Sequence, residues 1–381
     1  MSTAPASASA VLHRCGPDCA PWTRPARSGR SRSRWQTVDV HCHMFTSLAE
    51  ELVARTPQKK AEAQVQRKLL GEPSVTHNDA VMFPRAIRKM SSIEERLRDM
   101  DETGVDVQVV SPSPTQYYYW ADRDLASALV RAQNEHIAEQ CARHPARLAG
   151  MATVSLQHPD LAVAQLRHAV RELGLAGVEI STVIDGRDLD DARFHPFWAL
   201  AEELQTVVFV HPLGTTLGER VNGHYLSNII GQPLETTVAL SKLILGGLFD
   251  RHPGLKLLAA HGGGYLPGYA GRLDHGYRVR PETRTTARPP SEYLKQIWFD
   301  SVVYDPPILQ RLIDVAGLSQ VVLGTDYPFD MGMDDVHAFL RDVPSIDDAG
   351  MRDILGANAS RLFNLPRPSS DRVAPQEPEK C

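Results

Sequence analysis

Residues 38–43 read Val-Asp-Val-His-Cys-His, a short β-branched run that ends in a pair of histidines. The alternating valines predict a strand over residues 38–40. Because residues two apart in an extended chain point to the same side, His41 and His43 can share one side while Cys42 points away. This geometry suits two imidazoles bound to one cation at the end of a strand.

Seven further apolar runs follow this strand, and helical patterns separate them. The eight predicted strands are residues 38–40, 105–110, 148–154, 177–180, 206–210, 255–260, 297–301 and 321–323. Stretches with apolar residues at three- and four-residue spacing lie between them, at 92–103, 124–144, 159–173, 196–203, 236–250 and 307–316. This alternation predicts a closed parallel (β/α)8 TIM barrel. An open doubly wound sheet is the alternative, but no glycine-rich phosphate loop follows an early strand.

Polar residues stand directly after several predicted strands. His211 follows the fifth strand, His261 the sixth and Asp326 the eighth, and the His41-Cys-His43 pair follows the first. All five therefore belong to the C-terminal rim, where such barrels keep their chemistry. Each histidine alone could be a hydrogen-bonded core residue, and Asp326 alone could cap a helix. Together they favour one divalent metal held by three histidines and Asp326: zinc is preferred, with manganese, iron or cobalt as alternatives. The spare histidine would be free for proton transfer.

The composition describes a soluble globular chain of 381 residues with flexible ends. Residues 1–36 are rich in Arg, Ser and Pro, and residues 366–381 are again rich in Pro, Ser and charge, so both are expected to be flexible tails. Residues 37–365 form the expected barrel, with a lid insertion at about 45–89. Cys15 and Cys19 with His13 could bind a metal, but stray tail cysteines are the preferred explanation.

Charge and cysteine content exclude several classes of protein. The 41 basic and 46 acidic side chains are spread along the chain, which disfavours a nucleic-acid partner. No run approaches the length of a membrane span. Five scattered cysteines disfavour a disulfide framework and fit a cytoplasmic location.

The segments around the rim residues resemble the amidohydrolase superfamily, and within it the decarboxylase branch typified by 2-amino-3-carboxymuconate-6-semialdehyde decarboxylase. The segments are Val-Asp-Val-His-Cys-His (38–43), Phe-Val-His-Pro (209–212), Ala-His-Gly-Gly-Gly (260–264), Leu-Gly-Thr-Asp-Tyr-Pro-Phe (323–329), and the stretches 96–105, 231–237 and 271–277. The resemblance implies that His41, His43, His211 and Asp326 bind the metal and that His261 is a non-ligating acid or base. It also implies that Arg272 reaches the substrate carboxylate of a neighbouring subunit, which makes the active unit a homodimer.

Other positions depart from the branch or leave alternatives open. Leu213-Gly214 stands where the typical member has Trp-Asp, so the substrate pocket must differ. Arg85 and Arg88 are both candidates for binding a second substrate carboxylate, or are solvated helix charges. The fourth strand carries Glu179 and no lysine, which favours one metal over two.

One tyrosine and one aspartate each have two possible roles. Tyr119, within the Tyr-Tyr-Tyr-Trp run at 117–120, is expected to wall the substrate pocket or to pack in the core. Asp300 ends the seventh strand and is expected either to orient His261 or to cap the next helix.

The resemblance implies a metal-dependent decarboxylase of an unsaturated or aromatic carboxylic acid, of the carboxymuconate semialdehyde or hydroxybenzoate kind, acting in aromatic catabolism. The metal acts as a Lewis acid, His261 or Asp326 moves the proton, and Arg272 orients the carboxylate. A hydrolase of an ester, lactone or amide that uses the same ligands is the alternative. A metal-free binding barrel is a third class.

Overall fold

A computed structural model of the chain describes residues 33–365. Most of the expected tail over 1–36, with His13, Cys15 and Cys19, and all of the tail over 366–381 lie outside the described residues. Eight parallel strands form one sheet in the order β1-β2-β3-β4-β7-β8-β9-β10. These strands are β1 (Val38–Met44), β2 (Val107–Pro112), β3 (Leu148–Ala152), β4 (Gly177–Ile180), β7 (Val207–Val210), β8 (Lys256–Ala259), β9 (Ile297–Asp300) and β10 (Val321–Val322). The predicted eight-stranded barrel is confirmed.

The segment that follows β10 closes the barrel against β1. Val40 N donates to Leu323 O, Asp326 N donates to His41 O, and His43 N donates to Tyr327 O, at 2.8 to 2.9 Å. The loop after β10 therefore continues the hydrogen bonding with β1 up to the rim. There it places Asp326 beside the two histidines of β1.

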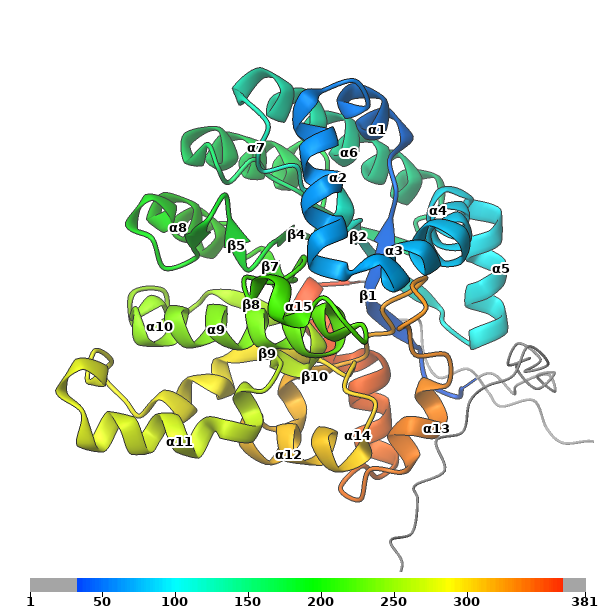
Figure 1. Cartoon of the computed structure of the whole chain (residues 1–381). Coiled ribbons are helices and arrows are strands. Elements are labelled where there is room, and N and C mark those ends of the chain that lie inside the picture. The colour runs from blue at the N-terminus through cyan, green and yellow to red at the C-terminus, as the bar shows by residue number, and fades with distance from the viewer. Residues whose placement is uncertain (1–32, 366–381) are drawn as a thin grey trace, which may run out of the picture.

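Helices surround the sheet in the alternating order that a parallel barrel requires (Figure 1). They are α5 (Ile93–Thr103), α6 (Arg123–Arg143), α7 (Pro159–Arg171), α8 (His195–Glu203), α9 (Gln232–Leu245), α10 (Leu248–Arg251), α11 (Leu266–Val279), α12 (Pro306–Ala316), α13 (Val336–Arg341), α14 (Asp348–Arg352) and α15 (Asn358–Phe363). The helix predicted over 236–250 is instead two helices, because Gly247 adopts a left-handed φ of 72° between α9 and α10. A short hairpin, β5 (Val183–Ile184) with β6 (Arg187–Asp188), was not predicted.

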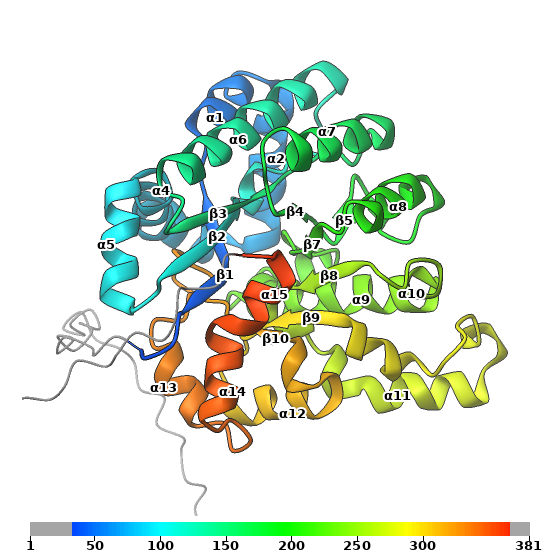
Figure 2. The ribbon, with the colours of Figure 1, turned by 180° about the vertical axis from the view of Figure 1, so that it is seen from behind.

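The inside of the barrel is an apolar core that α15 covers at one end. Val38, Val40, Val109, Met151 and Phe209 belong to the same buried cluster as Ala359, Leu362 and Phe363 of α15. Figure 2 shows α15 in front of the strands, whereas Figure 1, from the opposite side, shows α2 (Pro57–Leu70) and α3 (Glu72–His77) in front of them. One end of the barrel is thus covered by packed apolar side chains, and the other lies beneath the inserted segment.

The insertion between β1 and β2 is helical where the sequence shows little periodicity. It contains α1 (Ser47–Val53), α2, α3, a π-helical turn (Asn78–Met82) and α4 (Phe83–Ser91). Pro57 opens α2, and the Thr56 hydroxyl accepts a hydrogen bond from Lys59 N at 3.2 Å. No residue of α2 is buried, so the helix needs no apolar stripe. Among the described residues, no helix has the length and hydrophobicity to cross a membrane.

Candidate metal centre

A bulge in β1 aims both of its histidines into the barrel. Asp39 pairs with Gln108 of β2 and Cys42 pairs with Val110, so three steps along β1 match two along β2. The extra residue reverses the alternation after Val40, which faces the core. His41 and His43 then face inward at the rim, while Cys42 packs outward against the helices.

Four side chains from β1 and from the loops after β7 and β10 converge at this rim. One ligand atom of each of His41, His43, His211 and Asp326 lies within 4.8 Å of all the others, and all four residues are buried. Asp326 Oδ1 is 3.4 Å from Nε2 of His41 and 3.4 Å from Nε2 of His43. Ligands about 2.1 Å from a common ion lie at most about 4.2 Å apart, so the cluster needs only small shifts to coordinate one.

The hydrogen bonds of these side chains leave their inner atoms without partners. Within residues 33–365, Nε2 of His41, His43 and His211 and Oδ1 of Asp326 are buried and make no hydrogen bond. Leaving such atoms unpaired is costly unless something else binds them. The donor set and its lone pairs therefore fit a divalent cation, and the four residues would hold it.

The outer ring nitrogens of the two β1 histidines are held by neighbouring acceptors. His41 Nδ1 donates to Asp300 Oδ2 at 2.6 Å, and His43 Nδ1 lies 3.3 Å from Pro112 O. Glu179 Oε2 is 3.7 Å from the same nitrogen of His43, and Tyr117 donates its hydroxyl hydrogen to Glu179 Oε1 at 2.6 Å. When the ring is neutral, donation from Nδ1 fixes the tautomer in which Nε2 carries a lone pair toward the cluster.

Charges within the cluster shift the pKa values of its members. Burial lowers the pKa of His41, but Asp326 and Asp300 together raise it from 6.5 to about 10. Burial raises the pKa of Asp326, but the charge of His41 lowers it well below its usual range. Burial, and then the charges of His41 and His43, lower the pKa of His211 well below 6.5. His211 is thus neutral, as metal binding requires, whereas His41 must lose a proton first.

His261 stands beside the four ligands without belonging to their set. Its Nε2 lies 3.9 Å from Asp326 Oδ2, and its ring centroid is 5.1 Å from that of His211. Both His261 and Asp326 have left-handed backbones, with φ of 54° and 59°, a conformation that is costly for these residues and typical of functional sites. Asp300 holds the turn, because its carboxylate accepts from His261 N at 2.9 Å and from Gly262 N at 2.8 Å.

A large cavity opens directly onto this cluster. Its volume is about 740 Å³, and His211, His261 and Asp326 line it together with Leu213 and residues of α2. Lys59 and Arg67 of α2 are among the lining residues that were not predicted, and so is Ser227, whose buried hydroxyl has no hydrogen-bond partner in the described chain.

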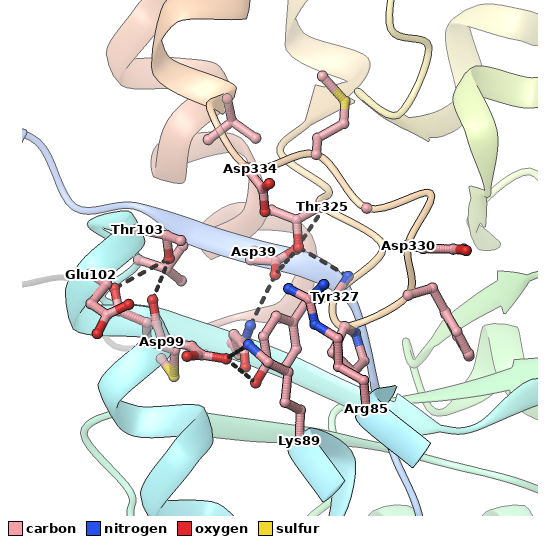
Figure 3. Close-up of a pocket in the computed structure, with 18 of the residues that line it drawn as sticks. Asp39, Arg85, Lys89, Asp99, Glu102, Thr103, Thr325, Tyr327, Asp330 and Asp334 are labelled. Carbon is pink, nitrogen blue, oxygen red and sulfur yellow. Dashed lines mark hydrogen bonds and ion pairs between the residues drawn. The ribbon is translucent and has the colours of Figure 1, made fainter. Parts of the chain in front are cut away.

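The other predicted substrate residues do not line this cavity. Arg85 belongs to a second, smaller cavity of about 130 Å³, which Figure 3 shows with Lys89 and Asp99. Arg88 is exposed, and its Nε lies 3.4 Å from Glu95. Tyr119 is stacked on Tyr117 with ring centroids 5.4 Å apart, and its hydroxyl accepts from Ser181 N. Arg272 is exposed on α11 and contributes nothing to the cavity of its own subunit.

Asp300 is the site residue whose main contact the sequence did not indicate. It orients the ring of His41 and the backbone of His261, and it does not cap α12, whose N-cap is Asp305. Its position at the end of the seventh strand was the available signal, since it shares the rim with the predicted ligands.

This barrel, with its cluster of histidines and an aspartate, is that of a known family. Residues 38–365 match the family model described as Amidohydrolase, and the chain belongs to this family. Over 272 residues it is 34% identical to 2-amino-3-carboxymuconate-6-semialdehyde decarboxylase of Dictyostelium discoideum, covering 71% of this chain and 76% of that protein.

Two solved structures extend this relationship to three dimensions. The chain superposes on 5-carboxyvanillate decarboxylase of Sphingomonas paucimobilis with a TM-score of 0.76 and 26% identity, covering 87% of this chain and all of the other (100%). It superposes on the dihydroxybenzoic acid decarboxylase of a Polaromonas species with a TM-score of 0.72 and 25% identity, covering 87% and 98%. That second structure contains manganese and the inhibitor 2-nitroresorcinol.

Proposed function

We propose that this protein is a metal-dependent decarboxylase that releases CO2 from an unsaturated or aromatic carboxylic acid of the carboxymuconate semialdehyde or hydroxybenzoate kind. One observation carries the proposal: four buried ligand atoms without hydrogen bonds meet within 4.8 Å of one another beside a large cavity. The similar proteins named above are decarboxylases, which favours this reaction over others of the family.

The bound ion would be held by His41, His43, His211 and Asp326. When bound, a divalent metal supplies a Lewis acid that polarises an oxygen of the substrate. Three imidazole nitrogens and one carboxylate oxygen suit zinc, which we propose as the resident metal, and they also accommodate manganese, the ion of the Polaromonas relative.

His261 and Asp326 are the proposed proton carriers. Loss of CO2 breaks the bond between the carboxyl carbon and the substrate, and the electron pair stays on the carbon that takes up a proton. His261 lines the cavity, and its Nε2 lies 3.9 Å from Asp326 Oδ2, close enough for the two to pass a proton along with a small movement.

The proposed active unit is a homodimer in which Arg272 orients the carboxylate in the neighbouring active site as a bidentate donor. Its exposure on α11 leaves the guanidinium available to a second subunit. Leu213 is the proposed contact for the substrate's apolar face, because it lines the cavity two residues after His211. The proposed binding partners are small carboxylic acids. The proposed location of the protein is the cytoplasm.

A hydrolase is the second candidate, because the same four ligands could serve attack on an ester, lactone or amide. The two reactions differ in one product. A decarboxylase releases one CO2 for each substrate consumed, whereas the hydrolase releases none.

The test is to load the purified protein with zinc or manganese and to measure CO2 from panels of hydroxybenzoates and carboxymuconate semialdehydes. We expect stoichiometric CO2 with at least one acid, and loss of more than about 99% of the rate in His261→Gln. His168→Gln, an exposed change on α7, is the control and should retain full rate. Ester or lactone hydrolysis without CO2 would overturn the proposal in favour of the hydrolase.

A further inference from the structure

The cavity beside the metal cluster is far larger than a single aromatic ring requires. A benzene ring fits an apolar cavity of about 150 Å³, whereas this cavity measures about 740 Å³. A simple hydroxybenzoate bound at the cluster would therefore leave most of the space to water. The unfilled part runs between α2, the turn at Asn78–Met82, the loop with Leu213 and the start of α12.

The walls of this remaining space are mainly hydrocarbon. Ile229 and Ile308 line it with 44% and 51% of their surface exposed, so both offer apolar surface that a ligand in the cavity would cover. Further apolar side chains continue the wall down to the metal cluster, namely Ala63, Leu70, Val75, Met82, Phe83, Leu213, Pro233, Val302, Val303, Phe329 and Met331.

The cations around the cavity already have acidic partners. Lys59 and Arg67 are the only lysine and arginine among the described residues that line it. Lys59 Nζ lies 3.5 Å from both Glu50 and Glu62 and 3.0 Å from the Tyr118 hydroxyl. Arg67 lies 3.1 Å from Glu72 and 3.4 Å from Asp79.

Acidic side chains also line the same space. Glu62, Asp79 and Asp330 face it in addition to Asp326. A second carboxylate on the substrate would have to displace one of the existing ion pairs and would meet these acids. A single carboxylate placed at the metal cluster displaces no ion pair and stays away from these three acidic side chains.

We infer that the substrate is a monocarboxylic aromatic acid that carries an apolar chain on the side of the ring away from its carboxyl group. This inference rests on the proposed decarboxylase function and names its substrate class. The carboxyl end lies at the metal cluster, and the chain fills the hydrocarbon-lined space between α2 and Ile308.

Two ligand series test the inference with independent readouts. The first consists of 2,6-dihydroxybenzoates that carry hydrogen, methyl, propyl or pentyl opposite the carboxyl group, assayed for CO2 release. The second consists of 2-nitroresorcinols with the same groups opposite the nitro group, assayed by calorimetric binding to the metal-loaded protein. In both series kcat/KM or affinity should rise about threefold for each methylene, since each buries apolar surface. A substrate with a second carboxylate in place of the chain should bind at least about tenfold more weakly than the unsubstituted acid.

Matched variants locate the chain in the cavity. Ile229→Asn and Ile308→Asn should each reduce the gain per methylene in the binding series. Val65→Asn is the control, because Val65 is 54% exposed on α2 and does not line the cavity, so the gain should be unchanged. All three positions are exposed, so the folded protein should be retained in each variant.

The outcomes separate the inference from the function on which it rests. Turnover of the unsubstituted acid with no gain from the chain, or a stronger preference for the dicarboxylate, overturns the inference and leaves the decarboxylase intact. Absence of CO2 from every acid, with chain-dependent binding of the nitroresorcinols, overturns the proposed function and keeps the apolar ligand site.

Discussion

Asp300 and His41 form a buried carboxylate–imidazole pair, with 2.6 Å between Asp300 Oδ2 and His41 Nδ1. The side chains of both residues are fully buried. The pair links the last residue of β9 to the middle of β1 and turns Nε2 of His41 toward His43, His211 and Asp326. Carboxylates that orient metal-binding histidines in this way fix the tautomer and increase the basicity of the ligand.

Replacing Asp300 by Asn should weaken metal binding by about ten- to a hundredfold, the usual effect of losing such a partner. The amide oxygen can replace Oδ2, which accepts from both His41 Nδ1 and His261 N, but the side chain loses its charge and places an NH2 group against Gly262 N. Competition with a chromophoric chelator measures the affinity. Asp305→Asn is the control, since its exposed side chain makes no capping bond to α12. Equal affinity in the two variants would contradict this role.

Metal binding should release a proton from His41 near pH 7.5. Burial lowers the pKa of His41, but Asp326 and Asp300 raise it to about 10 in the metal-free protein, so the ring is charged at that pH. The neutral ring is the form that binds a cation, so apparent affinity should increase as pH rises toward 10. Calorimetric titrations in two buffers of different ionisation enthalpy should give different heats. Identical heats would mean that no proton leaves.

Gly324→Ala should destabilise the fold by about 1–3 kcal/mol, because the new methyl group overfills a packed interior. A Cβ at this position would lie 2.9 Å from the Cβ atoms of both His41 and Asp300. Gly268→Ala on α11 is the matched control, since nothing lies within 4 Å of its Cβ, and it should stabilise by about 0.5–1 kcal/mol. Urea denaturation of both variants measures the difference. A neutral effect at Gly324 would show that the pair has room to move.

Mixing two inactive variants should restore activity if Arg272 serves the neighbouring subunit. Arg272→Ala keeps the metal ligands, and His41→Ala keeps the arginine, so a mixed dimer contains one complete site. Random exchange at equal amounts makes half of the dimers mixed, and the expected recovery is about one quarter of the wild-type rate. Arg278→Ala, an exposed arginine on the same helix, should stay active alone. No recovery after confirmed subunit exchange would place Arg272 outside the neighbour's site.

Much of the barrel could be predicted because its strands are short apolar runs with polar residues directly after them. Parallel strands of a barrel end on a common rim, and this rule alone predicts that four residues lie close together: His41, His211, His261 and Asp326. The bulge in β1 could not be predicted, because it arises from the pairing with β2 and no residue type in β1 indicates it.

The inserted segment was harder to interpret for a physical reason. Its helix α2 buries no side chain and therefore has no apolar stripe. Without such a stripe, the sequence indicates neither that the segment is helical nor which of its faces points toward the barrel. The sequence indicates Arg85 and Arg88 as candidates there, whereas the structure places Lys59 and Arg67 at the large cavity. Nothing local distinguishes an arginine that faces a cavity from one that faces solvent.

The most direct test of the central claim is anomalous diffraction from crystals of the manganese-loaded protein. We predict one peak per chain, about 2.0–2.3 Å from nitrogen atoms of His41, His43 and His211 and from a carboxylate oxygen of Asp326. A fully loaded protein with its manganese elsewhere, or with no ion among these four side chains, would contradict the account.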